Sequence, residues 1–188
     1  MTKKPLKIPT PQNLANVALY YLGRYAASEA ALRRVLTNRL RRVTMQNSEF
    51  VKDVERQRVL HSAIETIIAT HIKTGALNDA AFAEAKASSL RRQGRSRRAI
   101  RQKLCAKGIA GETIATALRQ SDDGAEAEEA EWNAALALAR RRKLGPFRKT
   151  PADADRRRKD FAALARAGFS ADIARRVLKT EAPEEWEW

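Results

Sequence analysis

Apolar residues recur every three or four positions along most of the chain, a spacing that predicts amphipathic α-helices. Alternation of apolar and polar residues never persists, so no β-strand is expected. The stripes and their flanking residues predict helices over 13–24, 28–40, 49–74, 78–90, 96–104, 112–118, from the end of the acidic stretch 121–131 to residue 143, over 153–167 and over 170–178. The fold class is therefore predicted to be all-α.

Capping residues mark the helix boundaries. Ser28 and Ser96 each precede an apolar stripe, and a serine hydroxyl at an N-cap accepts a backbone N–H group that the first helical turn leaves unpaired. Gly75, Gly108 and Gly168 follow the ends of predicted helices, where glycine enters the left-handed conformation without a Cβ penalty. Most helices are therefore expected to be short, with turns of a few residues between them.

One helical unit is written twice in the sequence. Ser28-x-x-Ala31-Leu32-Arg33-x-x-Leu36 aligns with Ser96-x-x-Ala99-Ile100-Arg101-x-x-Leu104 at an offset of 96 − 28 = 68. A second internal similarity, at an offset of 168 − 108 = 60, aligns Leu104, Gly108, Ile109, Glu112 and Leu118 with Leu164, Gly168, Phe169, Asp172 and Leu178. Repeats of this size are typical of stacked helical modules that bury their apolar faces against one another. We therefore predict three tandem three-helix repeats in an elongated, curved helical array.

The repeats and the changes in composition predict five segments. Residues 1–12 are expected to form a disordered leader, and residues 13–77 the first three-helix repeat with an extended third helix. The second three-helix repeat is predicted over 78–121 and the third over 122–180. Residues 181–188 are expected to form an acidic tail that contains two tryptophans.

Composition and charge narrow the class of partner. The hydrophobic share of 44% exceeds that of a disordered chain, whereas the aromatic share of 6% favours many thin helix–helix contacts over one thick core. The formal net charge of +15 indicates a polyanion or an acidic protein surface as the partner. Binding to a membrane surface is a competing interpretation, and it is disfavoured because no segment combines a basic face with Trp or Phe anchors.

Cellular location follows from segments that the sequence lacks. The single cysteine, Cys105, excludes a disulfide framework and is typical of a reducing compartment. No apolar run reaches the length of a membrane span, and the N-terminal residues have no apolar core of a signal peptide. We therefore expect a cytoplasmic protein that has no membrane partner.

Recognisable catalytic chemistry is absent from the sequence. There is no glycine-rich phosphate loop and no dinucleotide-binding fingerprint. His61 and His71 fall on different parts of one predicted helix, and with Cys105 they do not make a recognisable zinc site. We interpret the histidines as half-buried helix positions and Cys105 as a core residue. We predict that the protein is not an enzyme and that it has no catalytic residues, cofactors or metal ligands.

Basic residues gather where one predicted helix ends and the next begins. The candidate partner-binding or DNA-binding residues are Arg91, Arg92, Arg95, Arg97, Arg98, Arg101, Lys103, Arg140, Arg141, Arg156, Arg157, Arg158 and Lys159. No acidic residue interrupts 86–107, and charges of one sign repel, so a ligand is favoured over a merely solvated helix face. Arginine outnumbers lysine there, which favours bidentate contacts to phosphate or carboxylate.

The chemistry of that ligand stays open at this point. Few aromatic residues interleave with the clusters, and only Phe147 is close, so base stacking of the single-strand-binding kind is poorly supported. A phosphate backbone and an acidic protein groove both fit, because charge alone does not separate them.

The middle of the chain resembles the RecX family of recombination regulators. The resemblance rests on Gly75-Ala-Leu-Asn-Asp79-Ala-Ala-Phe82-Ala83, then Leu90-Arg-Arg-Gln-Gly94-Arg-Ser96-x-x-Ala-Ile100-x-x-x-Leu104-x-x-Lys107-Gly108-Ile109. The C-terminal run Arg157-Arg158-Lys-Asp-x-x-x-Leu164-x-x-x-Gly168-Phe169-Ser170-x-Asp172 is similar to the third repeat of that family. The similarity extends from about Leu14 to Leu178 and is most specific in the middle repeat.

The resemblance implies tandem three-helix repeats that bind the RecA–DNA filament and restrain ATP hydrolysis, strand exchange and the SOS response. The RecA filament is thus the expected partner, single-stranded or filament-bound DNA a second one, and a monomer the expected state. The chain departs from the family pattern in its longer first repeat and in an insertion at 144–151. A sequence-independent DNA-binding protein that needs no recombinase is the alternative, and a helix-turn-helix transcription factor a more remote one.

Overall fold

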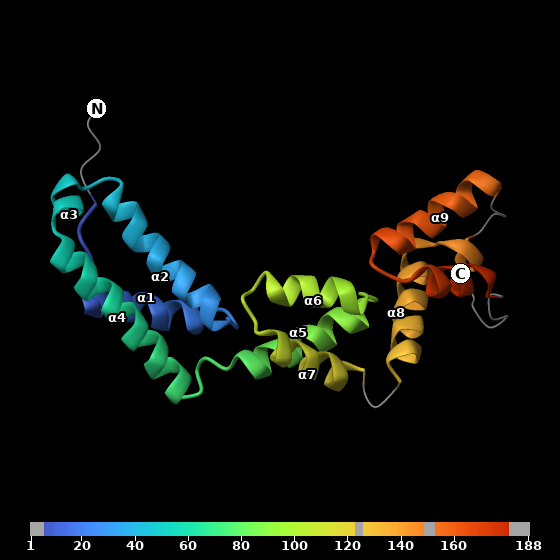
Figure 1. The fold of residues 1–188 in the computed structure, drawn as a ribbon, viewed down its shortest axis with the longest axis horizontal. Helices are drawn as coiled ribbons and strands as arrows, with labels where there is room; N and C mark the ends of the chain where they lie inside the picture. The colour runs from blue at the N-terminus through green and yellow to red at the C-terminus, as the bar shows by residue number, and fades with distance from the viewer. Residues whose placement is uncertain (1–5, 123–125, 149–152, 181–188) are drawn as a thin grey trace. The chain divides into compact units, whose positions relative to one another are not determined.

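The structure is a computed structural model that describes residues 6–122, 126–148 and 153–180 (Figure 1). These residues form ten α-helices and one short 3₁₀ helix, with no strand among them, so the all-α prediction is confirmed. The chain divides into two compact units. One unit contains residues 1–82 with 107–109, and the other contains 83–106 with 110–188.

The first unit is built from a helical hairpin and a long covering helix. Helix α1 (Pro11–Leu22) and helix α2 (Glu29–Thr44) pack against each other, and helix α4 (Val54–Lys73) packs against both. The short helix α3 (Ser48–Lys52) connects α2 to α4. The largest side chains of this core that are fully buried are Leu14, Leu32, Leu36, Phe50, Leu60, Ile64 and Ile68.

The prediction of one continuous helix over 49–74 is wrong. Asp53 has φ −89° and ψ 76°, which breaks the helix into α3 and α4, and its carboxylate accepts a hydrogen bond from the N–H of Arg56. An aspartate at an N-cap competes with helix continuation in this way. Val54 and Ile72, two apolar residues of the predicted helix, are 64% and 46% exposed near the two ends of α4.

The predicted leader over 1–12 is too long. Helix α1 begins at Pro11, and Thr10 caps it by accepting a hydrogen bond from the N–H of Asn13. Pro9 is buried, and Ile8 packs against the core of the first unit. Residues 1–5 of the predicted leader, like the predicted tail 181–188, lie outside the described residues.

The second unit holds most of the remaining helices, with helix α5 (Asp79–Arg92) beginning in the first unit and continuing into it. Its helices after α5 are α6 (Arg97–Cys105), α7 (Gly111–Ser121), α8 (Ala127–Arg142), α9 (Ala154–Arg166) and α10 (Ala171–Lys179). Helix α6 packs against α7, while α8, α9 and α10 pack together. The fully buried Leu138 and Leu164 belong to the core that α8, α9 and α10 form.

The predicted insertion over 144–151 contributes to this core. Residues Gly145–Phe147 form the 3₁₀ helix η1, which packs against α8 and α10. Phe147 is buried among the apolar side chains of α8, α9 and α10. The insertion therefore adds an aromatic anchor, and residues 149–152 lie outside the described part of the chain.

The predicted caps are confirmed. Ser28 accepts a hydrogen bond from the N–H of Ala31, and Ser96 does the same for Ala99. Gly75, Gly108 and Gly168 have φ of 75°, 80° and 94°. These local signals bounded most helices because they depend only on neighbouring residues.

The two serines also bond to residues far along the chain. The Ser28 hydroxyl donates to the carbonyl oxygen of Lys107 at 2.6 Å, within the first unit. The Ser96 hydroxyl donates to the carbonyl oxygen of Ala167 at 2.7 Å, within the second unit. In both cases the accepting residue directly precedes a glycine, Gly108 or Gly168, so the same link is built twice.

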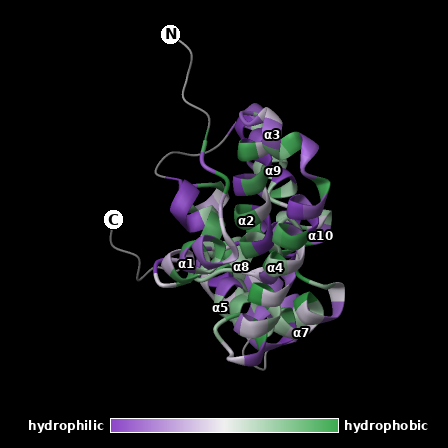
Figure 2. Ribbon diagram, turned by 90° about the vertical axis from the view of Figure 1, so that its left-hand side faces the viewer, coloured by the Kyte–Doolittle hydropathy of each residue, from purple (hydrophilic) through white to green (hydrophobic). Residues whose placement is uncertain are grey.

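The helices are amphipathic rather than apolar on all sides. Figure 2 shows hydrophobic and hydrophilic stretches mixed along individual helices. None of the helices in the described residues has the length and apolar character that spanning a membrane requires.

Candidate interaction surfaces

The exposed basic residues of the second predicted repeat lie mainly on helix α6. Arg98, Arg101 and Lys103 are exposed on that helix, and Arg92 is exposed at the end of α5. None of these four side chains makes an ion pair with another described residue. Arg98 and Arg101 are three positions apart and so neighbour each other on one helix face. The α6 face therefore presents cations that are available to a partner.

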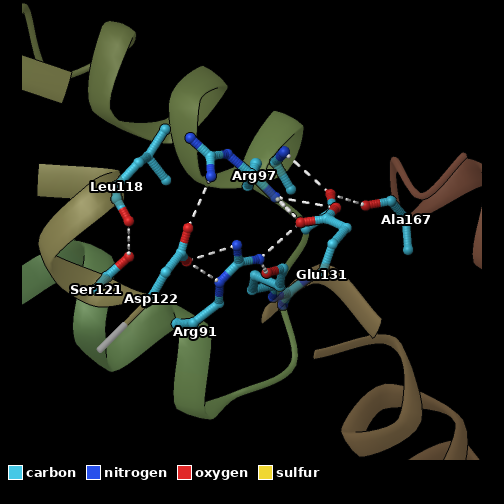
Figure 3. A network of polar contacts seen from close by, with 10 residues as sticks. Arg91, Arg97, Leu118, Ser121, Asp122, Glu131 and Ala167 are labelled. Atoms are coloured by element: carbon cyan, nitrogen blue, oxygen red, sulfur yellow. Dashed lines mark hydrogen bonds and ion pairs between the residues drawn. The ribbon is translucent and has the colours of Figure 1, made fainter. Parts of the chain in front are cut away.

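Arg91 is the exception among the predicted binding residues. Its side chain is only 8% exposed and is enclosed by two carboxylates (Figure 3). Its Nη2 atom lies 2.7 Å from Oδ1 of Asp122, and its Nη1 atom lies 2.8 Å from Oε2 of Glu131. The expectation that Arg91 belongs to an exposed basic surface is wrong, because a buried guanidinium needs its charge compensated inside the protein.

The side chain of Arg97 is partly exposed and also takes part in the buried network around Asp122. Its side chain is 33% exposed, and Nη1 lies 2.7 Å from Oδ2 of Asp122. Its backbone N–H donates to the carboxylate of Glu131, which thereby sits at the N-terminus of α6 (Figure 3). A carboxylate is stabilised there by the unpaired N–H groups and by the helix dipole. Arg97 thus orients the start of α6, and the neighbouring Arg95 is half-buried.

Two residues of the predicted acidic segment 122–131 explain these placements. Asp122 is the C-cap residue of α7, and Glu131 lies in α8, so both carboxylates belong to residues predicted in the third repeat and pair with Arg91 of the second. Two arginines of the basic run 86–107, Arg91 and Arg97, are therefore compensated in space by acids that are distant in the sequence. Residues 123–125 of the acidic segment lie outside the described residues.

The predicted cluster on α8 and α9 is exposed but largely engaged in local interactions. Arg141 donates to the carbonyl oxygen of Gln93 at 2.7 Å, and Arg140 is exposed and also has an interaction partner. On α9, Asp155 pairs with Arg158 and Lys159, and Asp153 lies 3.9 Å from Arg156. Arg157 is exposed beside them and makes no ion pair with a described residue.

The local pairs on α9 are solvent-exposed, and the pair of Asp155 with Lys159 shifts the pKa of both partners. Hydrogen bonds from Lys159 and then Arg158 lower the pKa of Asp155, and the bond to Asp155 raises the pKa of Lys159. Exposed pairs of this kind contribute little to stability. These cations therefore remain free to exchange an intrahelical carboxylate for an external one.

An additional buried ion pair, which the sequence did not reveal, holds the insertion in place. The Asp160 carboxylate, 1% exposed, accepts hydrogen bonds from Nε of Arg148 and from the N–H of Gly145, both at 2.8 Å. Burial by itself raises the pKa of Asp160, but these bonds outweigh burial, and the pKa lies below its ordinary value. This carboxylate anchors η1 to α9.

Sequence reasoning also passed over the cations of α10 and the tyrosines of α1. Arg175, Arg176 and Lys179 are exposed on α10, and the Arg176 guanidinium carbon lies 4.3 Å from the centroid of the Trp132 ring. Tyr20 and Tyr25 are 63% and 56% exposed at the end of α1. The close spacing of these residues in the sequence was the available signal in both cases.

No metal centre is assembled from the described residues. No group of three or more His, Cys, Asp or Glu side chains there is placed to hold a metal ion. The prediction that Cys105 is a core residue is wrong, because its side chain is exposed at the end of α6. His61 is exposed and His71 is half-buried on α4, so the half-buried position predicted for His61 is also wrong.

Comparison with known proteins identifies the family. A family model described as "RecX, second three-helix domain" matches residues 78–118, which contain α5 and α6 and most of α7. Regulatory protein RecX of Myxococcus xanthus is 43% identical to the chain over 177 residues, which are 94% of this chain and 89% of that protein. The chain belongs to the RecX family. The resemblance seen in the sequence is therefore confirmed.

Further members of the RecX family agree with this assignment. Regulatory protein RecX of Agrobacterium fabrum is 41% identical over 103 residues, which are 55% of this chain and 52% of that protein. The solved structure of RecX from Lactobacillus salivarius superposes with a TM-score of 0.62 at 20% identity, covering 90% of this chain and 94% of that one. Another RecX crystal structure superposes with the same TM-score of 0.62 at 21% identity, covering 90% and 72%. The structural matches establish a shared RecX fold, and the sequence matches place the chain among regulatory proteins.

Proposed function

We propose that this protein binds the filament that RecA recombinase forms on DNA and restrains ATP hydrolysis, strand exchange and SOS induction. Membership of a family of regulatory proteins supports a regulatory role without catalysis of its own. The observation that carries the proposal is the cationic surface of α6, where Arg98 and Arg101 neighbour each other and Lys103 is also exposed, within the segment that the family model matches.

The chemistry of that face suits a filament that contains nucleic acid and protein. A guanidinium makes paired hydrogen bonds with a phosphate or a carboxylate, and both groups occur on such a filament. The absence of ion pairs on Arg98 and Arg101 within the described residues means that no internal pair has to break before binding. The proposed contact set is therefore Arg92, Arg98, Arg101 and Lys103, with Arg157 as an additional exposed cation on α9.

The proposed organisation is three consecutive helical repeats. The first contains α1 to α4, the second α5 to α7, and the third α8 to α10. The Ser28–Lys107 and Ser96–Ala167 hydrogen bonds support this division, because each connects the second helix of one repeat to the corner before the third helix of the next. A monomer is proposed, since contacts between repeats supply the burial that a small helical unit lacks.

The direct test is the rate of DNA-dependent ATP hydrolysis by RecA, measured while this protein is titrated at substoichiometric amounts. A ligand that acts along a polymer is expected to inhibit well below one molecule per recombinase. Inhibition that begins only when the DNA is saturated with this protein would instead indicate competition for DNA. That result would favour the alternative of a sequence-independent DNA-binding protein.

A charge reversal on α6 tests the surface itself. Arg98→Glu combined with Arg101→Glu is expected to abolish inhibition at substoichiometric amounts while leaving helicity unchanged. Arg97 is left intact, because its bond to Asp122 belongs to the buried network. The matched control is Arg119→Glu with Arg166→Glu, two exposed arginines of the same unit that lie outside the proposed contact set. Full inhibition by the α6 variant would remove the claim.

A further inference from the structure

The start of helix α6 is electrostatically unfavourable in its own sequence. Its first two residues are Arg97 and Arg98, and its first turn contains no acidic residue. The N-terminus of a helix carries partial positive charge and unpaired N–H groups, so cations are disfavoured there. Each of the other α-helices from α2 to α10 has at least one acidic residue in its first turn. Helix α6 is therefore the member of this series whose start has no carboxylate of its own.

Glu131 of helix α8 supplies a carboxylate at this helix start. It lies 34 positions further along the chain, within the same compact unit. Its two carboxylate oxygens accept the backbone N–H of Arg97 at 3.1 and 3.3 Å (Figure 3). The Ser96 hydroxyl accepts the N–H of Ala99. The first turn of α6 is thus paired by one local side chain and by one from another proposed repeat.

The carboxylate of Glu131 is held in place by Arg91. The Nη1 atom of Arg91 donates to Oε2 of Glu131 at 2.8 Å and to the carbonyl oxygen of Arg95 at 3.1 Å. Its Nε and Nη2 atoms donate to Oδ1 of Asp122 at 2.9 and 2.7 Å. Because a guanidinium is planar, these bonds fix its orientation and with it the direction of the bond to Glu131. The side chain of Glu131 is only 15% exposed.

The exposed cations of α6 depend on this helix start. Arg98 directly follows Arg97, and Arg101 lies about one helical turn further along. Fraying of the first turn would take the backbone of Arg98 out of helical geometry. A partner would then have to order this turn on binding, which costs conformational entropy. A first turn that is already held in the free protein avoids this cost.

We propose that Glu131 is a positioning residue for the α6 surface. Through the N–H of Arg97 it holds the first turn of α6 in helical geometry, and it thereby keeps Arg98 and Arg101 in place for a partner. The inference rests on the proposed function, in which α6 contacts the recombinase filament. Glu131 acts through Arg91 and Arg97, because its carboxylate is engaged by both. The proposed third repeat thus completes the binding helix of the second.

Positioning and net charge predict opposite effects for Glu131→Gln. The substitution removes a negative charge, so a surface that binds a polyanion through charge alone would bind it more tightly. A neutral amide is also a weaker acceptor than a carboxylate, so the first turn is expected to fray. Half-inhibition of ATP hydrolysis by RecA on DNA is then expected to require about fivefold more protein. The limiting extent of inhibition is expected to stay unchanged, because every exposed cation is retained.

A second variant removes the change in charge. Glu131→Asp keeps the carboxylate and shortens its reach by one methylene group. It is expected to weaken inhibition in the same direction as Glu131→Gln, but by less.

Hydrogen exchange measures the first turn in the absence of a recombinase. In full-length Glu131→Gln, the amides of Arg97 and Ala99 are expected to exchange about tenfold faster than in the parent protein. The amides in the middle of α10 are expected to keep their rates, because the core of α8, α9 and α10 is unchanged. The measurement is made below the unfolding transition of every variant.

Two controls match the change in charge. Glu129→Gln neutralises an exposed carboxylate of the same helix. Asp160→Asn neutralises a buried carboxylate of the same unit, whose bonds go to Gly145 and Arg148 rather than to α6. Both are expected to leave the exchange rates at the start of α6, and the concentration for half-inhibition, as in the parent protein.

Several results would overturn the inference. Stronger inhibition by Glu131→Gln would show that net charge dominates, and parental exchange rates at Arg97 and Ala99 would show that Glu131 does not hold the first turn. Parental inhibition by a variant with a frayed first turn would show that its order is irrelevant to binding. Equal weakening by Asp160→Asn would assign the effect to lost stability. Failure of the parent protein itself to inhibit RecA would instead remove the proposed function, and the surface to be positioned with it.

Discussion

The Ser96 hydroxyl donates to the carbonyl oxygen of Ala167 at 2.7 Å while it accepts the N–H of Ala99 at 3.2 Å. One buried side chain thus caps α6 and ties it to the corner between α9 and α10. A hydroxyl is suited to both tasks, because it is a donor and an acceptor at once. Ser28 repeats the arrangement with Ala31 and Lys107.

Ser96→Ala is expected to lower the free energy of unfolding by about 2–3 kcal/mol, because it removes a cap and also leaves a carbonyl oxygen without its donor. Ser170 is the matched control: it caps α10 in the same way, and its hydroxyl donates to no other helix within the described residues. Ser170→Ala is expected to cost about 1 kcal/mol. Urea unfolding of both variants measures the difference, and equal losses would assign the Ala167 bond no energetic role.

Gly168→Ala is expected to destabilise the protein more than Gly75→Ala does. Both glycines have positive φ, at 94° and 75°, so alanine is strained at either position. A Cβ atom at Gly168 would lie 2.6 Å from Oγ of Ser96, whereas a Cβ at Gly75 would meet nothing within 4 Å. The cost at Gly75 is expected to be about 1 kcal/mol and that at Gly168 at least twice as large. Thermal unfolding of the two variants at one pH measures the difference. An equal fall in both melting temperatures would contradict the close approach of Gly168 to Ser96.

Arg91→Ala is expected to act on folding rather than on a partner. Removing the guanidinium leaves the carboxylate of Asp122, whose side chain is 3% exposed, with fewer compensating charges, and breaking a buried pair costs about 3–5 kcal/mol. Arg98→Ala removes an exposed arginine and is expected to change stability by less than about 0.5 kcal/mol. Chemical unfolding measures the free energy of unfolding of both variants. Equal values would contradict a structural role for Arg91 and would favour a role in binding a partner.

Asp160→Asn is expected to reveal a pH-dependent contribution from the insertion. The pKa of Asp160 is lower in the folded protein than in the unfolded chain, where it is about 3.9. The ion pair with Arg148 therefore stabilises the fold fully above that pH, and its contribution is lost as the pH falls through the folded value. The melting temperature of the parent protein is expected to exceed that of the variant at pH 7 and to approach it below about pH 4. A constant difference between pH 7 and pH 3 would contradict this assignment.

Most helices were predictable because their boundaries are encoded locally. Ser28, Ser96 and Gly108 act on the residues beside them, so the sequence alone indicated where helices begin and end. The break at Asp53 escaped because a single aspartate inside an apolar stripe is compatible with an unbroken helix. The start of α1 before residue 13 escaped for a related reason, since Pro11 is also typical of an irregular leader.

The binding surface was less predictable because burial depends on distant partners. Arg91 and Arg98 are equivalent as basic residues of one run, yet one is buried and the other exposed. The partners of Arg91 lie 31 and 40 positions away, at Asp122 and Glu131, and no local pattern indicates which arginine they enclose. Only the packing of α5, α7 and α8 decides it.

In both hydrogen bonds between proposed repeats, a serine hydroxyl of one repeat donates to a carbonyl oxygen of the next. The corresponding residue of the proposed third repeat is not a serine. Helix α9 is capped by Asp153, which occupies the place that Ser28 and Ser96 hold in the preceding repeats. An ionised carboxylate accepts the N–H of Arg156 but has no proton to pass to a carbonyl oxygen. The proposed third repeat therefore accepts this hydrogen bond at Ala167, but the side chain of Asp153 supplies no matching donor. Asp153→Ser would supply a hydroxyl donor at this position. This substitution is the natural starting point for designing an array with an additional repeat.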